Sequence, residues 1–191
     1  MKICFATNNG GKIREVHAML GQAFEVLSLK DLNCHQELPE THFTFEENAL
    51  EKAQFVFDNY KFPCFADDSG LVVDVLAGAP GVFSARYAGV HGNDMANNEL
   101  LLKNLEGITN RKARYEVVIA LVMNGFSKTF KGTVEGKILT QPQGIGGFGY
   151  DSLFVPDGYD LSFAELSLEI KNQMSHRGRA VRSLVEFLNS I

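Results

Sequence analysis

Two long stretches of alternating apolar and polar residues, joined by a two-residue turn, place the strongest limit on the fold of this chain. They lie within RYEVVIALVMNGFSKTFKGTVEGKIL, residues 114–139, and Asn124-Gly125 stands between them. Asn-Gly between two such stretches is the strongest short-range signal for a β-hairpin, because both residues accept the positive φ angles of a type I′ turn. The sequence therefore predicts a long antiparallel hairpin arm that joins a sheet.

The rest of the chain alternates between strand-like and helix-like segments. Continuous apolar stretches predict strands, and apolar residues at helical spacing predict helices, one of which opens with the capping-box pair Thr44 and Glu47. The predicted strands are 2–7, 24–29, 63–66, 71–76 and 152–156, and the predicted helices are 12–20, 44–60, 93–105, 163–173 and a last helix from 175. This pattern predicts an α/β fold, with a mixed twisted sheet and flanking helices. We see no linker, so we expect residues 1–191 to form a single domain.

Composition and charge exclude several classes of protein. The chain is 45% apolar and 21% charged, as expected for a folded protein, and its net charge of -5 argues against non-specific nucleic-acid binding, which needs a basic surface. No signal peptide or membrane-spanning segment is visible, so we expect no membrane partner and a cytoplasmic location. The cysteines, Cys4, Cys34 and Cys64, form no CxxC motif and leave one unpaired in any disulfide scheme, which fits a reducing compartment.

The loop TNNGGK, Thr7 to Lys12, lies between the first predicted strand and the first predicted helix. Backbone N–H groups at a helix N-terminus favour an anion, and phosphate is the natural candidate. The loop is not a Walker A motif, because Ala6 and Ile13 stand where that motif needs Gly and Ser or Thr. A tight turn that uses Asn and Gly only for their backbone freedom is an equal alternative.

Adjacent carboxylates, Asp67 and Asp68, interrupt an apolar stretch in FADDSGLVVDV. Such a pair is costly to bury unless a cation meets it, so it indicates either a turn or a site. Side chains alternate along a strand, so one of the two would face a site, and Asp68, beside a Ser69-Gly70 turn, is the better candidate. With a phosphate ligand, Asp68 and Glu40 would suit Mg²⁺, while Asp74 would pair with a basic neighbour.

The last predicted helix begins with SHRGRAVR, which places His176 and Arg177 at its first turn. Cations there oppose the helix dipole, so the cluster indicates a bound anion rather than only a solvated face. GIGGFG, residues 144–149, matches a dinucleotide motif in form, but it precedes a strand rather than a helix. We interpret it as a glycine loop whose backbone a ligand can approach closely. The rings of Phe148 and Tyr150 would either stack on a base or pack in the core.

Five motifs in order resemble the inosine triphosphate pyrophosphatase family: ATNNGGKIREV, ETHFTFEENALEKA, ADDSGLVVDVLAGAPGVFSARYAG, GGFGYD, and a lysine five residues before HRG. The resemblance covers residues 3–188. It implies hydrolysis of non-standard purine nucleoside triphosphates (ITP, dITP and XTP) to the monophosphate and pyrophosphate, which keeps them out of DNA and RNA. It also implies a nucleotide cleft between two lobes, dependence on Mg²⁺ and a homodimer.

The resemblance also assigns roles to residues. Lys12 and Asp68 would be catalytic, with Asp68 as general base, and Glu40 and Asp68 would hold Mg²⁺. The triphosphate would lie on the Thr7–Lys12 loop, and His176 with Arg177 would read the purine edge. The full set of substrate-binding residues would be Thr7, Asn8, Asn9, Gly10, Gly11, Lys12, Ser69, Phe148, Gly149, Tyr150, Asp151, Lys171, His176 and Arg177. Pro39 and Ser152 depart from the family pattern, where an acid and a proline are common.

Other functions compete with this one. A pyrophosphatase for other modified or pyrimidine nucleotides would differ only in substrate profile. A nucleotide-binding regulatory protein would show affinity without turnover, and Asp68 and Glu40 argue against it. A nucleic-acid-binding module would need a basic stripe that this acidic chain lacks.

Overall fold

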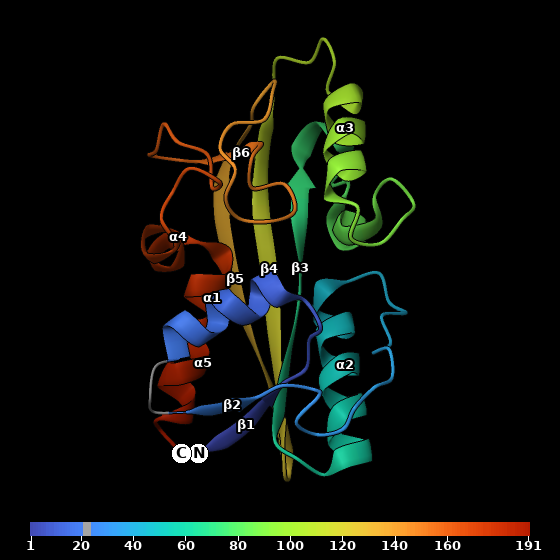
Figure 1. Cartoon of the computed structure of the whole chain (residues 1–191), viewed down its shortest axis with the longest axis vertical. Coiled ribbons are helices and arrows are strands. Elements are labelled where there is room, and N and C mark those ends of the chain that lie inside the picture. The colour runs from blue at the N-terminus through green and yellow to red at the C-terminus, as the bar shows by residue number, and fades with distance from the viewer. Residues whose placement is uncertain (21–23) are drawn as a thin grey trace. The chain divides into compact units, whose positions relative to one another are not determined.

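A computed structural model of the chain describes residues 1–20 and 24–191. Strands and helices alternate as the sequence predicts, and their positions can be followed in Figure 1. In chain order the elements are β1 Lys2–Phe5, α1 Gly10–Leu20, β2 Glu25–Leu27, α2 Phe45–Tyr60, β3 Cys64–Val73, the 3₁₀ turns Asp74–Leu76 and Gly81–Arg86, α3 Asp94–Asn104, β4 Lys112–Met123, β5 Phe126–Ile138, β6 Phe154–Pro156, α4 Leu168–Met174 and α5 His176–Leu188.

The described strands form one mixed sheet with the order β2-β1-β3-β4-β5-β6. β1 runs parallel to both β2 and β3, with Cys4 opposite Cys64, whereas β5 and β6 are antiparallel. β4 and β5 are neighbours joined by the two-residue turn Asn124-Gly125. Gly125 has a φ of 91°, but Asn124 does not have a positive φ, so the turn is not of type I′. The predicted hairpin and the mixed α/β fold class are confirmed.

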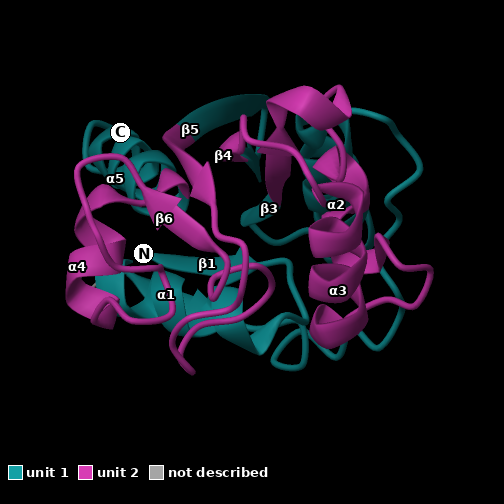
Figure 2. Cartoon of the chain, turned by 90° about the horizontal axis from the view of Figure 1, so that it is seen from above, with its two compact units in different colours: residues 1–68, 117–132, 177–191 teal, residues 69–116, 133–176 magenta. Residues whose placement is uncertain are grey.

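The chain divides into two compact units, shown in teal and magenta in Figure 2. Unit 1 comprises residues 1–68, 117–132 and 177–191, and unit 2 comprises residues 69–116 and 133–176. The division falls within β3, β4 and β5, so each of these strands contributes residues to both units. The single domain over residues 1–191 stays a prediction.

Unit 1 has two apolar cores because side chains alternate along its strands. Ile3 and Phe5 of β1 belong to a cluster with buried residues of α1 and α5, and the Phe5 ring stacks on Phe65 with 4.6 Å between centroids. Cys4 and Ala6 belong to the other cluster, with the buried face of α2. The cysteines are therefore small buried apolar residues, and burial raises the pKa of the Cys4 thiol to about 12.

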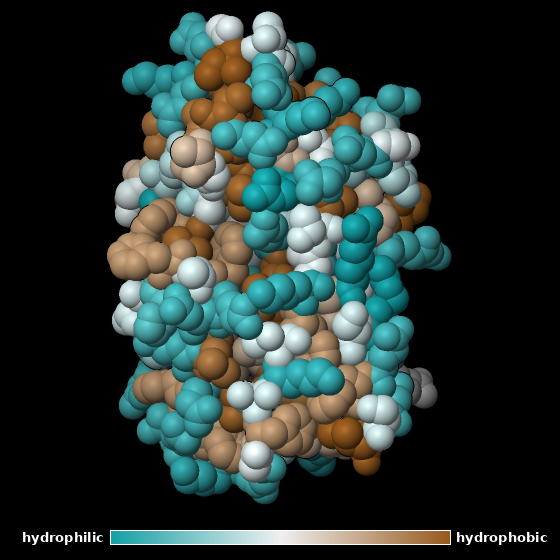
Figure 3. All heavy atoms as spheres, turned by 180° about the vertical axis from the view of Figure 1, so that it is seen from behind, coloured by the Kyte–Doolittle hydropathy of each residue, from teal (hydrophilic) through white to brown (hydrophobic). Residues whose placement is uncertain are grey.

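Unit 2 has its own core, built from the other ends of the long strands, α3 and the segment around β6. Tyr115 of β4 lies at its centre, with the rings of Phe154 and Phe163 at 4.9 and 5.8 Å between centroids. Leu101 of α3 and Leu105, the residue that caps the end of this helix, are buried in the same core. No helix in the described ranges is long and apolar enough to cross a membrane. On the face shown in Figure 3, hydrophilic and apolar residues are intermixed.

β3 differs from its prediction, because the strand continues through the carboxylate pair without a turn. Asp67 to Gly70 are regular strand residues, and the turn predicted at Ser69-Gly70 is wrong. Burying this pair in a strand is possible because cationic side chains meet both carboxylates, as described below. Two other boundaries also differ: residues 74–76 form a 3₁₀ turn instead of ending the strand, and the helix expected from 163 begins only after Ser167, whose side chain caps it.

Gly70 is required by a close approach within unit 2. A Cβ atom at this position would lie 2.2 Å from the carbonyl oxygen of Gly81 and 2.5 Å from Oγ of Ser84, which itself accepts a hydrogen bond from the backbone N–H of Leu71 at 2.9 Å. We therefore expect Gly70→Ala to lower the unfolding free energy by about 1–3 kcal/mol or more, measured by denaturant unfolding. Gly10→Ala is the matched control, because its Cβ would make only an ordinary contact of 3.8 Å with Arg14. Equal stability of the two variants would contradict this packing argument.

Candidate active site

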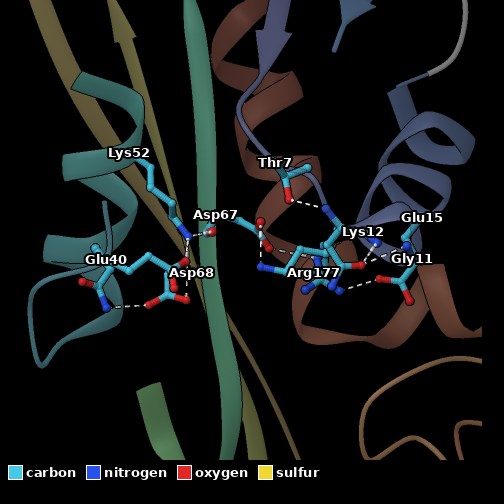
Figure 4. A network of polar contacts seen from close by, with 11 residues as sticks. Thr7, Gly11, Lys12, Glu15, Glu40, Lys52, Asp67, Asp68 and Arg177 are labelled. Atoms are coloured by element: carbon cyan, nitrogen blue, oxygen red, sulfur yellow. Dashed lines mark hydrogen bonds and ion pairs between the residues drawn. The ribbon is translucent and has the colours of Figure 1, made fainter. Parts of the chain in front are cut away.

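β3 directs Asp67 and Asp68 to opposite sides of the strand, and each meets a separate group of charged side chains in unit 1 (Figure 4). The side chains are 1% and 6% exposed, so neither carboxylate depends on bulk water for its stabilisation. Strand geometry predicts the opposite directions. The sequence argument expected one carboxylate to face a site, whereas the structure places charged partners on both sides.

The Asp67 side is a buried ion network. Nζ of Lys12 lies 3.0 Å from Oδ1 of Asp67, Nε of Arg177 lies 3.2 Å from Oδ2, and Nη1 of Arg177 also pairs with Glu15 of α1. Burial alone would raise the pKa of Asp67, but Lys12, Arg177 and Lys52 overcome that effect and lower the pKa to about 2. Asp67 is therefore a permanent anion that fixes two cations.

The Asp68 side is different, because here the effect of burial on the pKa is not overcome by nearby cations. Nδ2 of Asn48 donates to Oδ2 of Asp68 at 3.0 Å, while Nζ of Lys52 is 3.9 Å from Oδ1. Burial raises the pKa of Asp68, and the negative charge of Glu40 adds to the rise, against the opposing effects of Lys52 and Lys12. A carboxylate whose pKa is raised in this way has the proton affinity that a general base needs.

Lys52 joins the carboxylates of this side. Its Nζ donates to the carbonyl oxygen of Asp67 at 2.8 Å and pairs with Glu40. Burial lowers the pKa of Lys52, but Asp68, Glu40 and Asp67 more than compensate and raise it, so the ammonium is charged. The two carboxylates of Glu40 and Asp68 thus converge on one cation.

This donor set fits Mg²⁺. The described ranges contain no cluster of three His, Cys, Asp or Glu side chains placed to hold a metal ion. Mg²⁺, however, often takes only one or two protein carboxylates and completes its shell with water and substrate phosphates. Glu40 and Asp68 are close enough for the charge of one to raise the pKa of the other, so a divalent cation beside them would relieve that repulsion. Their role as metal ligands stays a prediction.

The loop Thr7 to Lys12 ends at the N-terminus of α1, as predicted. Oδ1 of Asn9 caps the helix by accepting from the backbone N–H groups of Gly11 and Lys12 at 2.9 and 3.1 Å, and Oγ1 of Thr7 accepts from the N–H of Asn9. The capping-turn alternative therefore accounts for Asn9 and Thr7. Lys12 is not explained by capping, since its side chain reaches back to Asp67. Phosphate binding by Asn8, Gly10 and the rest of this loop stays a prediction.

The first turn of α5 contains the predicted basic cluster, and its two leading residues have different surroundings. Arg177 is 2% exposed and pairs with Asp67 and Glu15. The sequence predicted that a bound anion would meet this cluster, whereas the structure shows that two carboxylates of the protein already meet Arg177. His176 is also buried, and its ring stacks on Tyr115 of unit 2 with 4.8 Å between centroids. Purine reading by these two residues stays a prediction.

The other predicted substrate-binding residues lie in unit 2. Nζ of Lys171 pairs with Oδ2 of Asp151 at 2.6 Å and lies 5.1 Å from the centroid of the Phe148 ring. Oδ2 of Asp151 also accepts from the backbone N–H of Phe148 at 2.9 Å, so one carboxylate joins the glycine loop to α4. The hydroxyl of Tyr150 donates to the carbonyl oxygen of Ser84 at 2.9 Å, and Ser69 is half-buried on β3. The structure thus places Phe148, Asp151 and Lys171 together.

Glu15, Asn48 and Lys52 take part in these networks and are absent from the sequence prediction. One signal was available for the last two: they lie four residues apart on α2, beside the buried alanines Ala49 and Ala53. A lysine on the buried face of a helix is unusual unless it is paired. Glu15 gives no such signal, because a glutamate in an amphipathic helix is normally expected on the exposed face.

Comparisons with known proteins agree with these features. The sequence model of the Ham1 family matches residues 3–187. A relative named dITP/XTP pyrophosphatase from Christiangramia forsetii is 49% identical over 189 residues, covering 99% of this chain and 100% of the relative, and one of the same name from Porphyromonas gingivalis is 47% identical over 98% and 97%. Among solved structures, the Ham1 protein of Staphylococcus aureus has a TM-score of 0.90 at 40% identity and covers 100% and 99% of the two chains. A HAM1 protein from Coxiella burnetii has a TM-score of 0.91 at 34% identity, with both chains fully covered.

Proposed function

Because the chain belongs to the Ham1 family, we propose that it hydrolyses the non-standard purine nucleotides ITP, dITP and XTP to the monophosphate and pyrophosphate. The reaction would keep these nucleotides out of DNA and RNA. The name dITP/XTP pyrophosphatase of relatives matched along their full length supports the substrate class. One structural observation supports the chemistry: the buried carboxylate of Asp68, whose pKa is raised, is bonded to Asn48 and lies 3.9 Å from Nζ of Lys52, which also pairs with Glu40.

Asp68 would act as the general base. It would take a proton from the water molecule that attacks the α-phosphorus, while the bond from that phosphorus to the bridging oxygen breaks and pyrophosphate leaves with the bond electrons. The raised pKa makes the carboxylate a better proton acceptor than an exposed aspartate. Asn48 holds Oδ2, which orients the other oxygen, Oδ1.

The triphosphate carries several negative charges, and cationic groups of unit 1 would balance them. Lys12 would bind the phosphates with the N-terminus of α1, and Asp67 would hold its ammonium in place. Glu40 and Asp68 would hold Mg²⁺, which when bound supplies further neutralisation of phosphate charge. Burial lowers the pKa of Lys12, and Asp67 opposes that effect.

The base and sugar would be bound by other predicted site residues. The Phe148–Asp151 segment would wrap the nucleoside, with Ser69 and Lys171 in contact with the nucleotide. Donors from His176 or Arg177 that face a 6-oxo group would favour hypoxanthine and xanthine, because the 6-amino group of adenine would set a donor against a donor. The enzyme would be a cytoplasmic homodimer, as the family resemblance implies. A pyrophosphatase for other nucleotides and a binding protein without turnover are the alternatives.

The test incubates purified protein with ITP, XTP, GTP and ATP in parallel, with Mg²⁺ or with a chelator, and assays pyrophosphate and orthophosphate separately. We expect pyrophosphate from ITP and XTP in at least tenfold excess over ATP, and none with the chelator. The same assay with UTP and CTP tests the first alternative, which turnover of these pyrimidine nucleotides in place of ITP and XTP would support. Binding of ITP without product would support the second, and orthophosphate would mean that a different bond is cleaved.

A further inference from the structure

Helix α3 holds both backbone polar groups of Gly149, the residue at the centre of the segment assigned to base binding. Oδ2 of Asp94 accepts from the backbone N–H of Gly149 at 2.7 Å, and Nδ2 of Asn98 donates to its carbonyl oxygen at 3.1 Å. Asp94 and Asn98 are four residues apart, so they share one face of the helix. All three residues belong to unit 2. Two side chains thus fix one peptide position from both sides.

The geometry of Gly149 makes this fixation specific. Its φ of +62° lies in the left-handed region, and a Cβ atom there would meet nothing within 4 Å. Glycine is therefore used for its backbone conformation and not for a close approach. An exposed glycine loop has many accessible conformations, so bonds to both its N–H and its carbonyl select one of them.

The neighbours of Gly149 are held by other groups. The N–H of Phe148 is bound by Asp151, and the hydroxyl of Tyr150 is bound by Ser84. The carbonyl oxygen of Phe148, which lies in the same peptide as the N–H of Gly149, also accepts from the N–H of Asp151 at 3.2 Å. Asp94 adds a second hydrogen bond to that peptide, and Asn98 bonds to the peptide on the other side of Gly149.

The orientation of the Asn98 amide is also determined by Gly149. Its nitrogen faces the carbonyl oxygen, while its own oxygen is buried with no hydrogen-bond partner in the part of the chain that the structure describes. Turning the amide over would place two oxygens against each other, which is unfavourable. Asn98 thus donates from Nδ2 to Gly149, while its Oδ1 stays buried without a hydrogen bond in the described structure.

We propose that Asp94 and Asn98 are positioning residues that preorganise the Phe148–Tyr150 segment for the purine base, so that α3 sets the affinity for the base through this segment. This proposal rests on the proposed function, because that function assigns the segment to the base. Preorganisation lowers the entropy lost on binding, so its loss weakens binding of the base more than it slows the chemical step.

Isosteric substitutions give opposite expected results at the two positions. Asp94→Asn keeps an acceptor for the N–H of Gly149, so the KM for ITP stays within about twofold of the parent, whereas Asp94→Ala raises it about tenfold. Asn98→Asp replaces the donor by a carboxylate that faces a carbonyl oxygen, so KM rises about tenfold or more with kcat within about threefold. The dissociation constant of IMP, measured by calorimetry, rises in parallel.

Asn93→Ala is the matched control. Asn93 caps the same helix by accepting from the N–H of Ala96 at 3.1 Å, whereas Gly149 in the described structure is bonded by Asp94 and Asn98. This variant therefore lowers the melting temperature and leaves both KM and IMP affinity unchanged. The proposal is overturned if Asn98→Asp binds IMP as the parent does, or if Asn93→Ala weakens IMP binding equally. The proposed function fails separately if the parent releases no pyrophosphate from ITP, because IMP binding by the variants is measured without turnover.

Discussion

Asp68→Asn is expected to lower kcat for ITP by about 10²–10⁴-fold while the nucleotide still binds, because the variant loses the group that accepts the proton of the attacking water. An asparagine has the same shape and still offers an oxygen to Nδ2 of Asn48, so the local packing is retained. Binding is measured by calorimetry with ITP, and turnover is measured by release of pyrophosphate.

The same variant should fold as stably as the parent. Burial raises the pKa of Asp68, so the folded state disfavours the charged form of this carboxyl group, and a neutral amide that still bonds to Asn48 avoids that cost. Asp74→Asn is the control: its carboxylate is about half exposed, pairs with Arg114 and should leave kcat unchanged. If Asp68→Asn turned over ITP at the parental rate, Asp68 would not be the base.

The fold could be predicted from the sequence wherever one signal dominated locally. The hairpin was predictable because Asn124-Gly125 joins two alternating stretches, and α2 was predictable because Thr44 and Glu47 form a capping box that the structure shows, with the N–H of Glu47 bonded to Oγ1 of Thr44. The continuity of β3 was not predictable in this way. It depends on lysine and arginine partners that are distant in sequence, and local patterns contain no information about them.

Sequence motifs singled out candidate site residues, but they did not show which side chains would contact one another. Asp68, Glu40 and Lys12 were singled out by motif, and the structure places them in or beside two networks of unit 1. The partner of Arg177 was not foreseen, because the argument from the helix dipole called for an anion without showing that Glu15 and Asp67 provide one. Asp94 gave no signal either, since an acidic residue in a helix first turn is already explained by the dipole.

Arg177→Ala is expected to lower the unfolding free energy by about 3–5 kcal/mol at pH 7, because it leaves Glu15 and Asp67 as buried charges with fewer cationic partners. For a chain of this length the melting temperature should fall by roughly 6–20 °C. Arg177 is charged at any relevant pH, since its pKa is raised further by both carboxylates against the effect of burial. The low pKa of Asp67 makes its charge stabilising above about pH 4 and lost as the pH falls toward 2, so the measurement belongs at neutral pH.

The control for this prediction is Arg179→Ala on the exposed side of α5, which should change stability by no more than about 0.5 kcal/mol. A double-mutant cycle with Glu15→Gln identifies the partner: the effects of Glu15→Gln and Arg177→Ala should be far from additive, because either change alone breaks the same ion pair. An Arg177→Ala variant with parental stability and only a raised KM for ITP would show that the guanidinium serves the purine edge instead of the network. In that case Arg177 would give up its contact with Glu15 or Asp67 when the substrate binds. The unfolding free energy of the free enzyme would then depend little on the Arg177–Glu15 ion pair.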